Sequence, residues 1–145
     1  MQYFEIEADE IDQIESLWEQ LNLFHKERSI DFKDRFNRMT FESRKTHFLK
    51  KEKLRCFCYK EEQILGYCVV SISADTAEIE SIFISPELRG HGVGENLMNK
   101  SLKWIKDHNI SKVSIGVAAG NEEAISFYKR FSFRKKCEIL ELIDD

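Results

Sequence analysis

Apolar residues recur along the chain with two different periods, and the changes of period divide it into strands and helices. The stretch YFEIEA, from Tyr3, alternates apolar and acidic side chains and predicts an opening strand. Apolar residues at intervals of three and four over 11–21 predict a helix, with Asp9 as its amino-terminal cap. A second, interrupted helical region covers 32–48. No chemistry is evident in either helical region.

The period returns to two after Leu54. Three runs, LRCFCYK, ILGYCVVSISA and AEIESIFIS, are separated by short polar stretches and predict an antiparallel meander. A helix from about Gly92 to His108 is expected next, followed by a strand KVSIGVA and a short helix EEAISFYKRF capped by Asn121. The alternating stretch CEILELI predicts a last strand.

The expected order is therefore β-α-α-β-β-β-α-β-α-β. This is an α/β (α+β) fold with a mixed, mostly antiparallel twisted sheet flanked by helices. A length of 145 residues, with no repeat or linker, predicts a single domain over 1–145. No apolar run approaches the roughly 18 residues of a membrane helix. The amino end also lacks a basic start and an apolar centre, so we expect a cytoplasmic protein with no membrane partner.

Charge is distributed unevenly along the chain. The net charge of −4 argues against general nucleic-acid binding, so no nucleic-acid partner is expected. Residues 1–24 hold seven acids and no Lys or Arg, whereas 25–55 hold eleven Lys or Arg against five acids. The run RKTHFLKKEKLR, from Arg44, is either a basic face for an anionic ligand or a solvated helix of mixed charge. The four cysteines form no CxxC pair and have no histidine at ligand spacing, so we expect buried thiols and no metal.

Glycines stand at positions 90, 92 and 94, immediately before the long helix, in the stretch SPELRGHGVGENLM. Glycine permits positive φ and leaves the backbone amides accessible. Amides that converge at a helix start form an anion site, which the helix dipole strengthens. Arg89 adds a cation. This loop therefore suits a phosphate, above all a pyrophosphate, although a simple turn is the alternative.

The strand, loop and helix AEIESIFISPEL-RGHGVG-ENLMNKSLKWI resemble the acetyl-CoA-binding core of the GNAT superfamily of N-acetyltransferases. That loop reads Arg/Gln-x-x-Gly-x-Gly/Ala, and Arg89, Gly92 and Gly94 fill it. A second block, VAAGNEEAISFYKRFSF, is similar to the family's next conserved segment. The resemblance implies a sheet splayed between strands at 78–84 and 112–118, with the pantetheine arm of the cofactor inserted like an extra strand.

The resemblance also implies a set of cofactor-binding residues. Backbone groups of Phe83 and Ile84 would pair with the arm, the loop would hold the pyrophosphate, and Asn121 would hydrogen-bond the arm. An N–H near Phe83 could polarise the thioester carbonyl. The expected acetyl-CoA contacts are Ile82, Phe83, Ile84, Arg89, Gly90, His91, Gly92, Val93, Gly94, Asn121 and Tyr128.

Two catalytic roles follow from the chemistry of amide formation. A lysine-like amine has a pKa near 10.4 and must lose a proton before it attacks a thioester. Glu78 and Glu80 share a strand face, and either could act as the base, directly or through water; Glu80 is preferred because it is nearer the splay. Burial against Ile82 and Phe83 is expected to raise its pKa. Tyr128 matches the family's tyrosine that protonates the departing thiolate. The alternative for Glu78 and Glu80 is that they are surface carboxylates, and the alternative for Tyr128 is that its ring only packs under the short helix.

The expected function is transfer of the acetyl group of acetyl-CoA to a primary amine, directly and in a ternary complex, with coenzyme A as product. The acceptor is left open among small amines, antibiotics such as aminoglycosides, polyamines, amino acids and protein amino termini. Acidic segments mildly favour a cationic acceptor. The alternative is a non-catalytic acyl-CoA-binding or regulatory module. A homodimer is also left open.

The sequence departs from the family pattern near its end. Ser132 stands where the family usually carries glycine, at a position that often ends a helix in the left-handed conformation. The family often closes with two antiparallel strands, but only twelve residues follow Phe133. The second of these strands is therefore expected to be short or absent.

Overall fold

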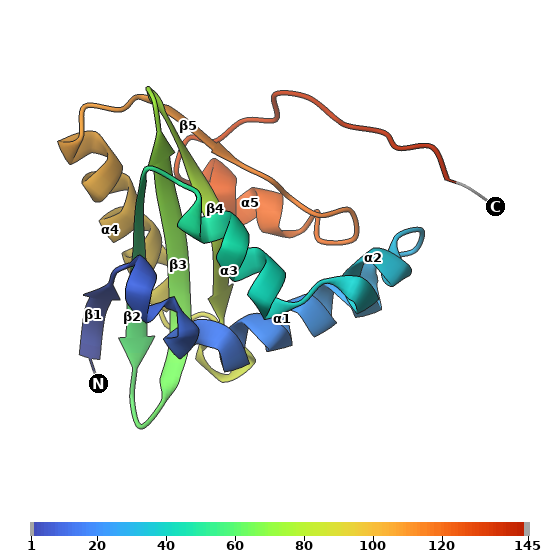
Figure 1. Ribbon diagram of the computed structural model, residues 1–145, viewed down its shortest axis with the longest axis horizontal. Helices are drawn as coiled ribbons and strands as arrows, with labels where there is room; N and C mark the ends of the chain where they lie inside the picture. The colour runs from blue at the N-terminus through green and yellow to red at the C-terminus, as the bar shows by residue number, and fades with distance from the viewer. Residues whose placement is uncertain (1, 144–145) are drawn as a thin grey trace.

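A twisted sheet of five strands forms the centre of the molecule (Figure 1). The computed structural model describes residues 2–143. The strands lie in the sheet in chain order; the first four run antiparallel to their neighbours, and the fifth is parallel to the fourth. The expected mixed, mostly antiparallel sheet is confirmed. The strands are β1 (Gln2–Ile6), β2 (Lys53–Lys60), β3 (Ile64–Ser73), β4 (Thr76–Ile84) and β5 (Lys112–Ile115).

Helices cover both faces of the sheet, as expected for this fold class (Figure 1). One face packs against η1, α1 and α3, and the other against α4 and α5. None of the helices within residues 2–143 is long and apolar enough to cross a membrane. The helical segments are η1 (Ala8–Ile14), α1 (Glu15–Arg28), α2 (Lys33–Arg38), α3 (Phe41–Leu49), η2 (Pro86–Leu88), α4 (Val93–Asp107) and α5 (Ala124–Lys129).

The central strand β3 separates two apolar cores. Tyr67 and Val69 belong to the core under η1, α1 and α3, whereas Cys68 and Val70 belong to the core under α4 and α5. Successive side chains of a strand point to opposite faces of the sheet. A strand that is buried on both faces therefore needs the uninterrupted apolar run that the sequence has here.

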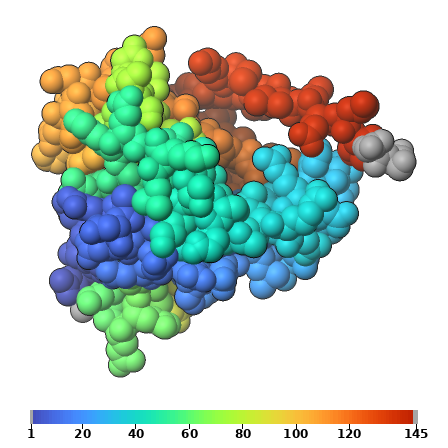
Figure 2. All heavy atoms as spheres, viewed as in Figure 1, coloured from blue at the N-terminus to red at the C-terminus, as the bar shows by residue number. Residues whose placement is uncertain are grey.

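The last strand expected over CEILELI is absent, and that prediction was wrong. Residues 134–143 join no strand of the sheet, and all of them are exposed. This segment stands away from the body of the molecule along part of its length (Figure 2). Alternation predicts which faces a strand would present. A strand forms only where a neighbouring strand pairs with its backbone, and the sequence does not show that partner.

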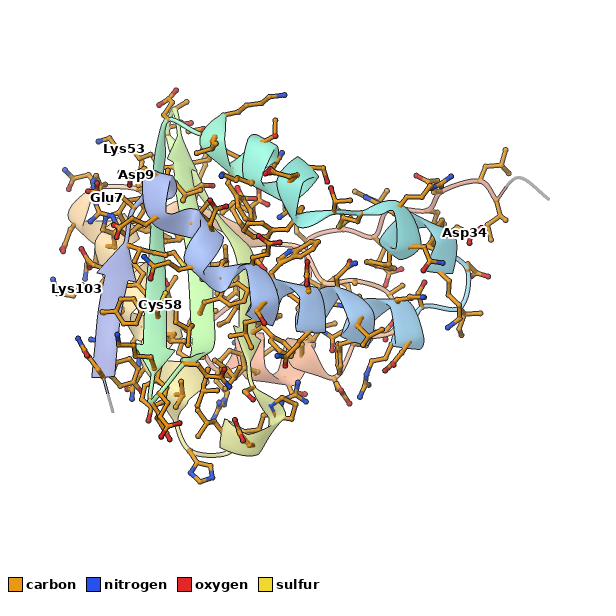
Figure 3. All side chains as sticks on the ribbon, turned by 60° about the horizontal axis from the view of Figure 1, so that its bottom comes forward. Glu7, Asp9, Asp34, Lys53, Cys58 and Lys103 are labelled. Atoms are coloured by element: carbon orange, nitrogen blue, oxygen red, sulfur yellow. The ribbon has the colours of Figure 1, made fainter. Side chains whose placement is uncertain are left out.

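Two expected helix caps also differ from the structure. Asp9 lies inside η1, whose N-cap is Glu7, and both residues lie where β1 leads into η1 (Figure 3). Asn121 precedes α5, whose N-cap is Glu123. The amide of Ala124 donates to the carbonyl of Asn121, so a turn leads into this helix. Both errors arise because short turns at helix starts move the boundary by a few residues.

The cysteines are buried in the sheet, with one exception. Cys56, Cys58 and Cys68 are buried, and the sulfur atoms of Cys56 and Cys58 lie 3.6 Å apart on β2, where Figure 3 labels Cys58. Burial is the main cause that raises the pKa of Cys56, and burial also raises that of Cys68 to about 12. Cys137 is exposed on the unpaired C-terminal segment, so the expectation of a buried thiol was wrong there.

The departure at Ser132 yields a test of stability. Ser132 has a φ of 72°, in the left-handed region that favours glycine, just after the end of α5. Ser132→Gly is expected to raise the free energy of unfolding by about 1 kcal/mol, measured by urea denaturation. Ser126→Gly, inside α5 and exposed, is the control and should lower the free energy of unfolding. Equal effects of the two substitutions would refute this explanation.

Candidate functional site

The strands β4 and β5 separate at one end of the sheet. Their parallel ladder ends at the pair formed by Ile79 and Ile115, and Ile115 is the last residue of β5. β4 continues to Ile84. Along residues 80–84, one edge of β4 therefore has no strand beside it. A strand edge with free N–H and C=O groups can bind another extended chain through ladder hydrogen bonds.

The loop between β4 and α4 has the backbone conformation of an anion site. Gly90 and Gly92 have φ of 83° and 81°, and Gly92 is the N-cap of α4. A Cβ at either position would meet nothing within 4 Å, so the conformation of the backbone, and not a lack of room, favours glycine. Gly94 differs, because a Cβ there would lie 3.4 Å from Ile84 and 3.5 Å from Phe127. The first amides of α4 lack partners within the helix and lie at its positive end.

A cleft of about 520 Å³ lies where the end of β4, the glycine loop, α1 and α5 meet. Most of its wall consists of aliphatic and aromatic side chains and of the glycine backbone, with charged groups among them. The residues of the wall are Leu21, Phe24, Ile82, Phe83, Ile84, Leu88, Arg89, Gly90, Gly92, Val93, Gly94, Glu95, Asn121, Glu123, Ala124, Phe127, Tyr128 and Arg130.

Two arginines of this wall lie over aromatic rings. The guanidinium of Arg89 is 5.5 Å from the ring centre of Phe24 and 5.7 Å from that of Phe83. The guanidinium of Arg130 lies 5.2 Å from the ring centre of Phe127. These distances are within the range of cation–π attraction. Arginine is always charged, so both groups add positive charge to a wall that also carries Glu95 and Glu123.

Tyr128 is the titratable group of the wall that lies deepest, with only 9% of the residue exposed. Burial is the main cause that raises the pKa of its phenol to about 12, and the nearby Cys68 acts in the same direction. The hydroxyl therefore stays protonated at neutral and mildly basic pH. Such a group can donate a proton to an anion that forms in the cleft.

Glu80 is the extra residue of a β-bulge. On β3, Val69 and Val70 are neighbours, but on β4 they pair with Ser81 and Ile79, so Glu80 has no partner residue. A bulge turns two successive side chains toward the same face of a sheet. Glu80 and Ser81 accordingly both face the side covered by α1 and α3.

The carboxylate of Glu80 is fully buried, with 0% of the side chain exposed, and has several polar neighbours. The hydroxyl of Ser71 donates to its Oε2 at 2.6 Å, and Lys51 Nζ lies 3.3 Å from the same atom. Its Oε1 lies 3.4 Å from His47 Nε2 and 3.9 Å from Arg44 Nη2. Arg44 Nη2 also donates to the backbone carbonyl of Glu80 at 3.3 Å. Three residues of the basic run that begins at Arg44 thus surround a carboxylate of the protein itself and not an anionic ligand.

This placement bears on the expected role of Glu80 as the base. Glu80 is not part of the cleft wall, and cations surround it instead of the apolar environment expected from Ile82 and Phe83. Its role as base stays a prediction, which the geometry does not favour. Glu78 is half-buried; burial, and then the charge of Glu80, raise its pKa. It too lies outside the wall.

All but one of the expected cofactor-binding residues lie on the cleft wall. The exception is His91, which is exposed and whose amide donates to the carbonyl of Leu88. The sequence reasoning missed Leu21 and Phe24 of α1, because their spacing continues the apolar stripe of an ordinary core helix. It also missed the convergence of α3 on Glu80, although the basic residues of α3 have helical spacing. Within residues 2–143, no group of three or more His, Cys, Asp or Glu could hold a metal ion.

Comparison with known proteins identifies the family. The profile of the acetyltransferase (GNAT) family matches residues 13–133. An uncharacterized N-acetyltransferase of Methanocaldococcus jannaschii is 40% identical over 62 residues, which are 43% of this chain and 27% of that protein. A Bacillus subtilis protein, whose name describes a ribosomal protein bS18-alanine N-acetyltransferase, is 31% identical over 102 residues, 70% of this chain and 63% of that protein. The chain thus matches less than two thirds of the length of either relative.

A solved structure agrees with this result. The aminoglycoside N-acetyltransferase AAC(6')-Iy, in complex with CoA, superposes with a TM-score of 0.70 at 14% identity, covering 99% of both chains. At this identity the likeness shows the fold alone, whereas the profile covers most of the chain. The splayed sheet and the glycine loop agree with the profile match over residues 13–133, and this profile match shows that the chain belongs to the acetyltransferase (GNAT) family.

Proposed function

We propose that residues 1–145 act as one catalytic domain, an acetyl-CoA-dependent N-acetyltransferase that transfers the acetyl group directly to a primary amine in a ternary complex. The main support is the free edge of β4 over residues 80–84, beside the glycine loop at the start of α4. This edge suits an extended chain with amides, and the loop suits a pyrophosphate. The CoA complex of AAC(6')-Iy, which has the same fold, supports this choice of donor.

In this proposal, each part of the cleft binds one part of the donor. Backbone groups of Phe83 and Ile84 pair with the pantetheine amides, and Asn121 hydrogen-bonds the same arm. The amides of the glycine loop and the start of α4 bind the pyrophosphate, and Arg89 provides a counter-charge. Ile82 and Phe127 supply apolar contacts. His91, which lies off the wall, has no part in binding.

The reaction needs little covalent chemistry from the protein. The neutral amine attacks the thioester carbonyl, a C–N bond forms, and the C–S bond breaks. An N–H of β4 near Phe83 stabilises the developing oxyanion. Tyr128 then donates its proton to the departing thiolate and regains one from solvent; its raised pKa keeps the phenol protonated but also makes it a weaker acid. Water, or Glu78 through water, takes the proton that the amine loses.

We propose a protein or peptide amino terminus as the first acceptor to test. An α-amino group has a pKa near 8, so roughly a tenth of it is neutral at pH 7, whereas a lysine-like amine is almost entirely charged. Such an acceptor needs less help from a base, which fits a cleft whose wall lacks Glu78 and Glu80. The name of the Bacillus subtilis relative points to the same class of acceptor.

A thiol-release screen with acetyl-CoA tests this function. We expect peptides with a free α-amino group to release coenzyme A faster than lysine-containing peptides with a blocked amino terminus, aminoglycosides or polyamines. Donor binding is measured in parallel by calorimetry. Gly92→Ala is expected to weaken it about tenfold, because an alanine disfavours φ of 81°. Gly116→Ala is the control, because that glycine is off the wall and has open space around it.

The other outcomes of the screen are equally informative. Donor binding without release for any amine would support the non-catalytic acyl-CoA-binding module. Absence of donor binding would mean that the glycines serve only as a turn. Fast release with a different amine class would keep the transferase proposal but reject the peptide acceptor.

Substitution of Tyr128 tests the proton donor. Tyr128→Phe is expected to lower kcat by about a hundredfold while the Kd for acetyl-CoA stays unchanged, because only the hydroxyl is lost. With its pKa near 12, Tyr128 should cause no fall in kcat below about pH 11 in the unaltered protein. An unchanged kcat in the variant would show that the hydroxyl does not take part in the chemistry.

A pair of substitutions separates the two roles considered for Glu80. Glu80→Gln is expected to lower the free energy of unfolding by about 2 kcal/mol, because it removes the charge that Lys51, His47 and Arg44 surround. The fall of kcat/KM toward acidic pH should remain in this variant, because Glu80 is not the base in this proposal. Loss of that fall, with the stability unchanged, would instead identify Glu80 as the base.

Glu78→Gln is the matched comparison and should act in the opposite direction. A raised pKa means that the charged carboxylate is disfavoured in the folded state. The substitution should therefore increase stability at neutral pH, and this gain should disappear as the pH falls below the ordinary pKa of Glu. A gain that persists at low pH would point to another cause.

A further inference from the structure

A second cavity, of about 360 Å³, lies between the edge strand β1 and the carboxyl-terminal half of α4. Both elements lie on the same side of the molecule (Figure 1). The first residues of α4 line the donor cleft, whereas Lys100, Lys103, Trp104 and Asp107 line this second cavity, here called the α4 pocket. Among the described residues, the two cavities share no wall residue. A volume of this size suits a small ligand.

Three aromatic rings form the apolar part of the α4 pocket. Phe57 is 6% exposed, and Tyr3 and Trp104 are half-buried. The hydroxyl of Tyr3 accepts a hydrogen bond of 2.9 Å from the side-chain amide of Asn96. The ring of Trp104 lies 4.6 Å from the ring of His108, centre to centre. These contacts hold two of the rings in place, and half-buried rings around a cavity can stack with an aromatic ligand.

Each acid of the pocket wall already has a basic partner. Glu5 Oε1 lies 2.8 Å from Arg55 Nη1, and Asp107 Oδ2 lies 2.9 Å from Lys103 Nζ. Lys100 differs, because no acid within residues 2–143 lies within ion-pair distance of its ammonium group. The wall of the α4 pocket therefore carries one positive charge that has no counter-charge.

This free charge lies beside the aromatic rings. Lys100 Nζ is 5.3 Å from the ring centre of Tyr3. Lys103 and Trp104 follow Lys100 by three and four positions, so the three side chains are neighbours on one face of α4. Figure 3 labels Lys103 beside β1. An acidic group on a ring that lies against Tyr3 and Trp104 is therefore within reach of Lys100.

We propose that the α4 pocket binds a small planar aromatic carboxylate. The ring of the ligand lies against Phe57 between Tyr3 and Trp104, and its carboxylate pairs with Lys100. Most of the affinity comes from the apolar area that the ring buries, because an exposed ion pair contributes little and salt screens it. The lysine instead selects for negative charge. This inference does not depend on acetyl transfer in the donor cleft.

Calorimetry of the full chain with 1-naphthylacetate tests the site. We expect a Kd at or below about 1 mM. The uncharged 1-naphthylacetamide should bind about threefold more weakly, and cyclohexylacetate, which lacks an aromatic ring, about tenfold more weakly. Saturating coenzyme A should leave the Kd unchanged, because the two cavities share no wall residue. Displacement by coenzyme A, or no binding of 1-naphthylacetate at 10 mM (roughly ten times the expected Kd), would overturn the proposal.

Substitution of Lys100, which is exposed and can change without disturbing the core, provides a second readout. In Lys100→Gln, 1-naphthylacetate should bind about threefold more weakly and no better than its amide, whereas Lys100→Arg should keep the preference for the acid. Lys106→Gln is the matched control, because Lys106 is exposed on α4 but lies off the pocket wall.

Substitution of the stacking ring tests the other half of the site. Trp104→Leu should weaken the binding of the acid and of its amide equally, by about tenfold. In the unaltered protein, 1-naphthylacetate should shift the amide resonances of 3–5 and 100–107 in NMR spectra. A preference for the acid that survives Lys100→Gln, or resonance shifts that centre on 82–94 in the donor cleft, would refute the proposal.

Discussion

The early end of the ladder between β4 and β5 is the constraint on which the rest of the site depends. Pairing stops at Ile79 and Ile115, and β4 alone continues to Ile84. If β5 continued along β4, its backbone would take the hydrogen bonds that are otherwise free for an extended ligand. The glycine loop directly after β4 then places helix amides and Arg89 at the end of this free edge. The free edge of β4 and the anion site of the glycine loop thus follow one another along the chain.

A strand without a neighbour on one side needs support elsewhere, and in this chain α3 provides it. Glu80 lies on the same face of β4 as Glu78 and points toward α3, where Arg44, His47, Lys51 and the hydroxyl of Ser71 surround its carboxylate. The carboxylate of Glu80 is buried, and its removal would leave the basic groups around it without their counter-charge, so the cluster stabilises the position of Glu80. It holds β4 from the face opposite α4 and α5. The charged residues of α3 therefore act on the site through the position of β4.

The free edges of β4 and β5 differ in the side chains that surround them. The edge of β4 over 80–84 lines a cleft with a glycine loop, which suits a small anionic ligand with amides of its own. The outer edge of β5 has no such loop beside it, and its side chains Val113, Ile115 and Val117 are apolar and partly buried. The side chains around each edge, and not the edge itself, determine what binds there.

The sequence by itself determined the kinds of elements, their order and the glycine loop, because these depend on local period and on residues with unusual backbone freedom. Only the tertiary structure decided where the strands pair. Alternation in CEILELI could not show that this stretch finds no strand to pair with, and the face shared by Glu78 and Glu80 could not show that α3 covers it with basic side chains. Leu21 and Phe24 could not be told from core residues for the same reason. Pairing, burial and the choice of a charged partner depend on residues far apart in the chain, which no local pattern records.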